Sequence, residues 1–142
     1  MQNKLMWIVV AILVVGGIYW YMNQGAEPAS EASEPVVVAL SAQNDSGMNG
    51  TATLTSMGGS TLVELALTGA PAGIVQPAHI HTGSCATIGG VVYPLEFPVN
   101  GVSATTLNVS LDAILAQLPL ALNVHKSAEE VSVYVACGDL MR

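Results

Sequence analysis

Basic side chains are nearly absent from this chain of 142 residues, which has three Lys and Arg residues against ten Asp and Glu. From Val36 onward there are two basic side chains and seven acidic ones. A protein that binds nucleic acid or anionic lipid head groups needs a basic surface to neutralise their phosphates. We therefore expect no nucleic-acid partner, and we interpret the acidic balance of this region as a contribution to solubility.

Side chains that carry metal or nucleophilic chemistry are also scarce. The chain has only three histidines, His79, His81 and His125, and only two cysteines, Cys85 and Cys137. It contains no phosphate-binding loop, no paired-carboxylate motif and no nucleophile-base-acid set. These five residues are therefore the main candidates for metal or redox chemistry.

One long stretch near the N-terminus lacks charge altogether. Residues 5–22 form an uncharged, largely apolar run of 18 residues that ends in Tyr19-Trp20-Tyr21-Met22. A helix of this length just spans a bilayer, and aromatic residues are enriched at membrane interfaces. A cleaved signal peptide is the alternative, but it requires a shorter apolar core and a small-x-small cleavage site. We expect residues 5–22 to be an uncleaved transmembrane anchor.

The residues on either side of this run predict its orientation. Residues 1–4 carry Lys4 and the amino terminus, whereas residues 23–35 contain three glutamates and no large apolar side chain. Because positively charged flanks stay inside, we expect residues 1–4 to be cytoplasmic and the chain to cross the cytoplasmic membrane once. Residues 23–35 are predicted to be an acidic, flexible linker, and residues 36–142 an extracytoplasmic domain in the periplasm or at the cell surface.

Short apolar runs separated by turn residues fill the region 36–142. Within Ser60–Leu67, apolar and more polar residues alternate as in a half-buried strand. Ser110 is placed to cap a short helix that Pro119 would end. The eight predicted strands are Val36–Ala42, Thr51–Met57, Ser60–Leu67, Pro77–His81, Tyr93–Val99, Val102–Val109, Leu120–Lys126 and Val131–Cys137. This pattern predicts an all-β sandwich or closed barrel with little helix.

The histidines fall on these predicted strands. His79 and His81 flank Ile80, so strand alternation projects both imidazoles to one face while Ile80 points away. His125 lies in another predicted strand, and strand pairing can bring it beside them. Three neutral imidazoles bind a divalent transition-metal ion and leave a coordination position open. The alternative is a hydrogen-bonded polar network, and we favour metal binding because all three histidines can be placed on converging strands.

The cysteines fit the predicted compartment. The space outside the cytoplasmic membrane is oxidising, which favours a disulfide between Cys85 and Cys137 over two free thiols. Such a bond would tie the loop after His81 to the last strand and stabilise the fold by roughly 4 kcal/mol.

Three segments resemble the Cu/Zn superoxide dismutases and their copper-only relatives. They are His79-Ile80-His81 with the following Cys85, Asn123-Val124-His125-Lys126-Ser127-Ala128-Glu129-Glu130, and Val135-Ala136-Cys137-Gly138-Asp139-Leu140. The resemblance covers residues 36–142 in order and spacing. It implies an eight-stranded Greek-key β-barrel, copper ligands at the three histidines and an intrasubunit disulfide between the two cysteines.

The sequence departs from that family at two places. Residues 86–92 contain no His, Asp or Cys, where the family has a bridging histidine and its remaining zinc ligands. Tyr134 stands three residues before Cys137, where the family has an arginine that attracts superoxide. We therefore expect a copper ion held by three histidines, no zinc site, and no full dismutase activity. A copper-only superoxide dismutase is an alternative.

A second resemblance points to the same barrel without a reaction. The segment Ala78-His79-Ile80-His81-Thr82-Gly83, followed by glycines and valines, is similar to the repeat of chordin-type (CHRD) domains, found in chordin and in many bacterial secreted proteins. That family is described by its fold, which resembles the dismutase barrel. The likeness implies, as a further alternative, a metal-free structural or adhesion domain.

Overall fold

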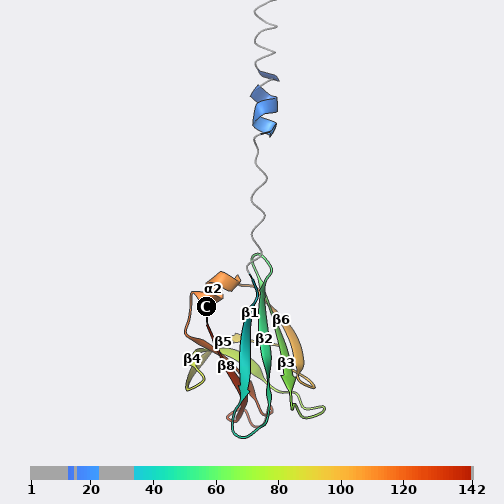
Figure 1. Ribbon diagram of the computed structural model, residues 1–142, viewed down its shortest axis with the longest axis vertical. Helices are drawn as coiled ribbons and strands as arrows, with labels where there is room; N and C mark the ends of the chain where they lie inside the picture. The colour runs from blue at the N-terminus through green and yellow to red at the C-terminus, as the bar shows by residue number, and fades with distance from the viewer. Residues whose placement is uncertain (1–12, 15, 23–33, 142) are drawn as a thin grey trace, which may run out of the picture. The chain divides into compact units, whose positions relative to one another are not determined.

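The computed structural model describes residues 13–14, 16–22 and 34–141, which belong to two separate units. In the first unit, residues 13–14 and 16–22 are helical (Figure 1). Among the described residues, no helix is both long and apolar enough to cross a membrane. Half of the predicted anchor at residues 5–22 and most of the linker at residues 23–35 lie outside the described residues, so both stay predictions.

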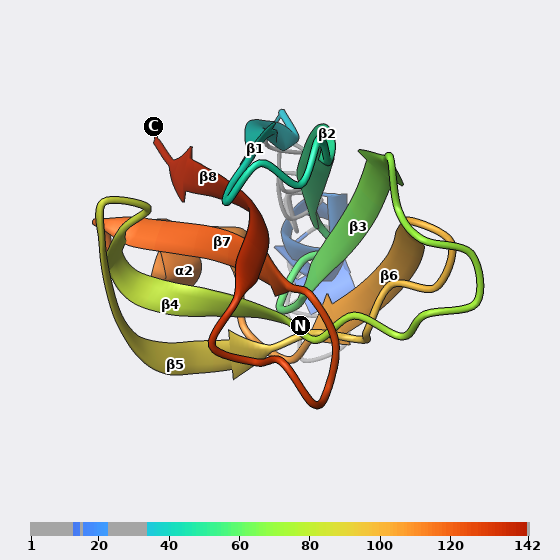
Figure 2. The same ribbon diagram turned by 90° about the horizontal axis from the view of Figure 1, so that it is seen from below.

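The second unit is built from antiparallel strands. Its elements are β1 (Val36–Ala42), β2 (Asn49–Ser56), β3 (Thr61–Thr68), β4 (Ala78–Ser84), β5 (Thr87–Pro94), β6 (Val102–Leu107), the short helix α2 (Leu111–Leu115), β7 (Leu120–His125) and β8 (Tyr134–Leu140). The strands form one sheet in the order β5-β4-β7-β8-β1-β2-β3-β6, which curls into a half-barrel (Figure 2). The predicted all-β class and the number of strands are confirmed for residues 34–141.

Strand β1 joins the two halves of this sheet. Its residues Val36–Leu40 pair with β2, whereas Ser41 and Ala42 pair with β8. One half therefore consists of β1, β2, β3 and β6, and the other of β5, β4, β7 and β8. Both halves supply one apolar face to a common core, with Leu54 and Val63 from the first and Ile80 and Leu122 from the second fully buried. Each such side chain stabilises the fold by about 1.5–3 kcal/mol.

The helix α2 forms as the sequence indicates. The Ser110 hydroxyl accepts a hydrogen bond from the Ala113 N–H at 3.3 Å, which caps the helix at its N-terminus. Leu111 and Ile114 are buried in the core. The predicted cap and the apolar side of this helix are therefore confirmed.

The predicted fifth strand at Tyr93–Val99 is wrong. The actual strand β5 begins at Thr87 and ends at Pro94, and it forms a hairpin with β4 in which Ser84 pairs with Thr87. Glycines at positions 89 and 90 made this segment resemble a loop. At Gly89, however, a Cβ atom would lie 2.3 Å from the Thr82 hydroxyl, so the close approach of β4 requires glycine there.

Candidate metal centre

The three histidines come together on one face of the β4–β7 pair, and we call them the histidine cluster. His79 and His81 point to the side opposite Ile80, which is fully buried in the core. His125 ends the neighbouring strand β7. One nitrogen from each ring lies within 4.8 Å of the others, an arrangement that can hold a metal ion. The prediction that strand alternation and pairing gather these side chains is confirmed.

Backbone carbonyls orient two of the rings. His81 Nδ1 lies 3.0 Å from the Gly89 carbonyl oxygen on β5, and His125 Nδ1 makes a short contact with the Val131 carbonyl. A carbonyl only accepts hydrogen bonds, so both Nδ1 atoms must carry the proton. In the neutral rings, both Nε2 atoms then keep a free lone pair, which is the form that binds a metal.

The Gly89 carbonyl reaches His81 because the β4–β5 pairing is irregular. His81 pairs with Val91, whereas Gly83, two residues further along β4, pairs with Ile88. Strand β5 therefore has one extra residue in this interval, a β-bulge that alters the direction of its local backbone. The bulge lies beside the histidine cluster.

The separation of two nitrogens in the cluster suits a shared ion. His79 Nδ1 lies 3.1 Å from His125 Nε2. Two nitrogens that bind one ion at about 2.0–2.1 Å lie roughly 3 Å apart. A direct hydrogen bond between the same two atoms is the alternative, but it leaves His81 Nε2 buried without a partner. A metal ion would satisfy all three nitrogens, which the hydrogen-bonded network does not.

The surroundings keep two of the rings neutral. Burial lowers the pKa of His79, and the neighbouring charges of His125 and His81 lower it further. Burial also lowers the pKa of His125, an effect that His81 reinforces and the hydrogen bond to Val131 opposes. Lowered pKa values keep the nitrogen lone pairs available for a metal at more acidic pH than an exposed histidine would allow.

We expect the metal-free protein to lose stability as the pH falls through the histidine range. In the unfolded chain His79 and His125 titrate near 6.5, above their pKa values in the folded state. Between the folded and unfolded values the unfolded state binds more protons, so the free energy of unfolding rises with pH and levels off above about 6.5. Melting temperatures recorded between about pH 5 and 8 measure this dependence.

The variant His79→Gln is the control for this pH dependence. It should have a shallower slope in the same interval than the unmodified protein, because one titrating ring is gone while the carboxylates are unchanged. A melting temperature that rises on acidification in this interval, or an unchanged slope in the variant, would contradict the expectation.

The disulfide lies on the same half of the sheet. Cys85 and Cys137 are bonded, with an S–S distance of 2.09 Å, which confirms the predicted pairing. The N–H of Cys85 also donates to Asp139 Oδ1 at 2.6 Å. Both contacts tie the turn of the β4–β5 hairpin to β8. Since this hairpin supplies the carbonyl that orients His81, the disulfide supports the histidine cluster.

Aromatic rings border the cluster on two sides. The Tyr134 ring packs edge-on against His125 with ring centroids 5.1 Å apart, and Phe97 packs in the same way against His79 at 6.1 Å. Tyr134 therefore places an aromatic side chain directly beside the histidine cluster. Phe97, the only phenylalanine in the chain, was not predicted as a site residue.

Asn123 was also missed as a site residue. It interrupts the apolar run of β7, has no exposed surface, and finds no partner within the protein for either side-chain polar atom. A polar residue within an otherwise apolar strand was the available sequence signal. Its pairing partners are His79 on β4 and Cys137 on β8, which places it within the site.

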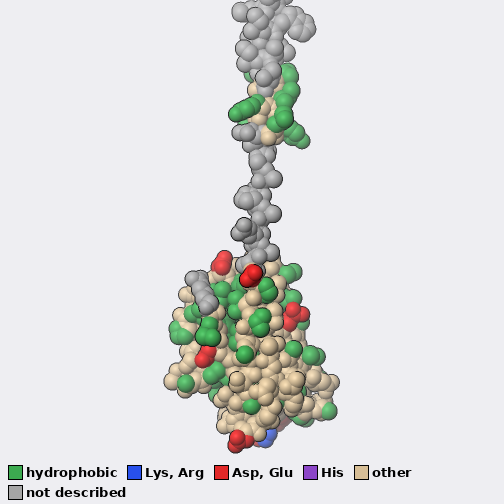
Figure 3. Space-filling view, viewed as in Figure 1, with side chains coloured by type: hydrophobic (Ala, Val, Ile, Leu, Met, Phe, Trp, Pro, Cys, Tyr) green, Lys and Arg blue, Asp and Glu red, His purple; other side chains and the backbone are tan. Residues whose placement is uncertain are grey.

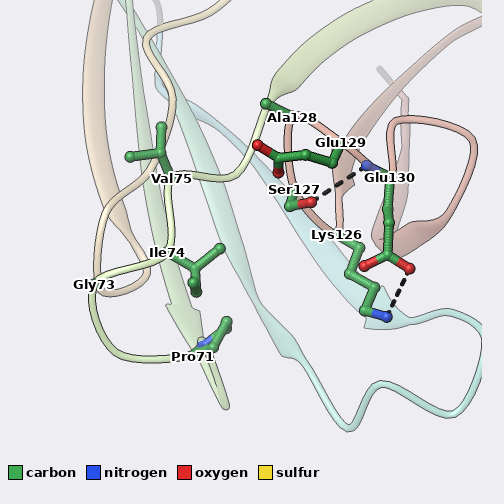
Figure 4. A pocket seen from close by; sticks show the side chains of 9 residues that line it. All are labelled: Pro71, Gly73, Ile74, Val75, Lys126, Ser127, Ala128, Glu129 and Glu130. Atoms are coloured by element: carbon green, nitrogen blue, oxygen red, sulfur yellow. Dashed lines mark hydrogen bonds and ion pairs between the residues drawn. The ribbon is translucent and has the colours of Figure 1, made fainter.

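A cavity of about 510 Å³ begins at the residue that follows His125. Residues 126–130 line one side and Pro71, Ile74 and Val75 the other, as Figure 4 shows. The Lys126 Nζ atom pairs with Glu130 Oε1 at 2.9 Å at its edge. Lys126 is the only basic residue in the range 34–141, and acidic side chains are scattered over the face of the domain drawn in Figure 3.

The chain was compared with known families, proteins and structures. No family model, no curated protein and no solved structure matches it. The dismutase-like and chordin-type resemblances therefore stay predictions from short segments, and the site must be interpreted from its own geometry.

Proposed function

We propose that the protein holds one copper ion through His79, His81 and His125. The observation that carries the proposal is the buried Nε2 atom of His81, which has no partner among the described residues although its ring belongs to the histidine cluster. In the same cluster, His79 Nδ1 and His125 Nε2 lie 3.1 Å apart. A buried polar atom without a partner costs about 1–3 kcal/mol, and a metal ion would remove that cost. Three ligands also leave one coordination position for a further group.

Copper is the proposed metal for two reasons. Copper(II) binds imidazole sites more strongly than the other divalent first-row metals, including zinc. The resemblance to copper-binding dismutases, through the His79-Ile80-His81 segment, points the same way. Strand β5 and its hairpin contribute no His, Asp or Cys between residues 86 and 92, so we propose no separate zinc site.

The proposed fold family is the dismutase-like Greek-key barrel. The strand order supports it, because the connections β3–β4, β5–β6 and β6–β7 each cross from one half of the sheet to the other. Crossing connections of this kind are typical of Greek-key folds. The chordin-type alternative shares this architecture, so the histidine cluster, and not the strand order, separates the two.

Metal loading tests the proposed function. The purified protein is exposed to copper(II) or zinc(II), dialysed, and analysed for metal by mass spectrometry. We expect one copper ion per chain to be retained and zinc to be displaced by equimolar copper. Protons should be released when binding takes place at a pH where the histidines are still partly protonated. Retention of neither metal would contradict the proposal and favour a metal-free structural or adhesion domain of the chordin type.

A copper-only dismutase is the second candidate, which the resemblance favours. We propose that copper in this site turns over superoxide slowly, because Tyr134 stands where the family has an anion-attracting arginine and the domain is acidic overall. Superoxide decay measured with the copper-loaded protein separates the two functions. Fast, copper-dependent turnover would favour the enzyme.

The site is proposed to lie outside the cytoplasmic membrane on a single-pass anchor. We expect the full-length protein to stay in the membrane fraction through a carbonate wash, because residues 5–22 lack charge and end in aromatic residues. Protein immunoblots of the washed membranes, together with N-terminal sequencing, check this. A soluble mature form that begins near Ala26 would instead favour a cleaved signal peptide.

A further inference from the structure

Asn123 lies among the histidines, on the face of the sheet that carries the histidine cluster. It pairs directly with His79 on the neighbouring strand β4. His125 lies two residues further along β7, so its side chain projects to the same face. His81 pairs with Ala121, the preceding residue of β7 on that face, and is therefore the diagonal neighbour of Asn123. All three histidines thus surround this one carboxamide.

The carboxamide of Asn123 has no hydrogen-bond partner among the residues that the structure describes. The residue has no exposed surface, and neither Nδ2 nor Oδ1 finds a hydrogen-bond partner. Buried amides nearly always form hydrogen bonds, because an amide group that is removed from water without a new partner destabilises the fold by its full desolvation free energy. Next to Asn123 on the same face, His81 Nε2 is also buried and without a partner. Three polar atoms that need partners therefore belong to two neighbouring residues on one face of the sheet.

We infer that Asn123 holds a small hydroxylic ligand, with water as the resting case, in the fourth coordination position of the metal. This inference rests on the proposed function. The carboxamide both donates, through Nδ2, and accepts, through Oδ1. A ligand that satisfies both atoms must itself accept and donate hydrogen bonds, as water does. An anion such as azide only accepts, so it leaves Oδ1 unsatisfied.

The chemical consequence is selectivity at the open position. Asn123 favours hydroxylic ligands over aprotic anions because displacing a well-held water by a group that cannot reproduce its hydrogen bonds weakens binding. Ala121, the small residue opposite His81, places no polar group of its own beside the ligand. Asn123 therefore acts as a positioning residue for the ligand and not as a metal ligand.

The test uses the full-length, copper-loaded protein and three variants. Asn123→Leu removes both hydrogen bonds at similar volume, Asn123→Asp keeps an acceptor in nearly the same shape, and Asn108→Leu is the control at an exposed asparagine. Electron paramagnetic resonance in water enriched in the magnetic isotope of oxygen detects a copper-bound water. Azide titration measures the affinity of the open position for an aprotic anion.

We expect the unmodified protein and Asn108→Leu to show the oxygen coupling and to bind azide weakly. Asn123→Leu should keep one copper per chain, lose the ordered oxygen coupling, and bind azide about tenfold more tightly. Asn123→Asp should keep the coupling and bind azide about tenfold more weakly, because a carboxylate repels the anion and still accepts from water. The metal-free Asn123→Leu protein should melt no lower than the unmodified protein, since a buried unpaired amide is gone.

Other outcomes separate the two proposals. Equal oxygen coupling and equal azide affinity in the unmodified protein and both Asn123 variants would overturn the inference while leaving copper binding intact. A water held by Asn123 but not coupled to copper would overturn it as well. If Asn123→Leu does not fold, Asn123→Asp still decides by its azide affinity. Failure of the unmodified protein to retain copper would instead overturn the proposed function.

Discussion

Replacing His81 or His125 by alanine is expected to abolish stoichiometric copper binding and to leave the sheet folded. Each imidazole supplies one of three ligands, and even the loss of an outer hydrogen bond around a ligand weakens metal binding by about 10- to 100-fold, so the loss of a ligand should weaken it more. The fold depends instead on the apolar core on the opposite side of β4, where Ile80 is fully buried. Calorimetric copper titration and thermal melts measure the two effects.

Lys126→Ala is the matched control for these histidine variants. It changes the residue directly after His125, and its half-exposed side chain pairs only with Glu130 in a surface ion pair. Such pairs contribute little to stability, so copper affinity and melting temperature should both stay close to those of the unmodified protein. Copper binding that survives the loss of either histidine would contradict the three-ligand site.

Loss of the disulfide is expected to have the largest effect on stability. The bond closes a separation of 52 residues between Cys85 and Cys137. On the loop-entropy model this constraint stabilises the folded state by about 4 kcal/mol. The double variant Cys85→Ala, Cys137→Ala should therefore melt about 15 °C lower than the unmodified protein. Its copper affinity should also fall, because the hairpin that orients His81 loses one of its two contacts with β8.

Reductant provides the internal control for this prediction. It should lower the melting temperature of the unmodified protein to that of the double variant and leave the double variant unchanged. Thiol labelling should find no free cysteine in the native protein before reduction. Equal melting temperatures with and without the bond would contradict a stabilising role for it.

The sequence was sufficient to predict which residues form the cluster but not how they are held. Strand alternation around Ile80 predicts that His79 and His81 share a face, and the structure confirms it. The groups that orient His81 and His125 are main-chain carbonyls of Gly89 and Val131. Every residue has such a carbonyl, so no residue type identifies them in the sequence.

The error at β5 has a tertiary cause. Two adjacent glycines are typical of a loop, whereas here a Cβ atom at Gly89 would clash with Thr82 across the hairpin. That contact exists only once β4 and β5 have paired. Strand β5 ends at Pro94, whose nitrogen has no hydrogen to donate to a continuing strand. For Asn123, the sequence shows a polar residue within the apolar run of β7. Its position among the histidines depends on the register between β7 and β4, which the sequence does not show.

Main-chain carbonyls hold the rings of His81 and His125. The histidine cluster should therefore tolerate amino-acid substitutions around it far better than insertions or deletions. Substitution at Val131 leaves its carbonyl in place, so the orientation of His125 is insensitive to the amino acid chosen there. Deleting one residue from the β5 bulge would instead shift the register of β5, so that a different carbonyl would face His81 Nδ1. The orientation of the His81 ring would then change. Among distant homologues, the spacing between His81 and Cys85 and the length of the hairpin should therefore vary less than the identities of the residues within it.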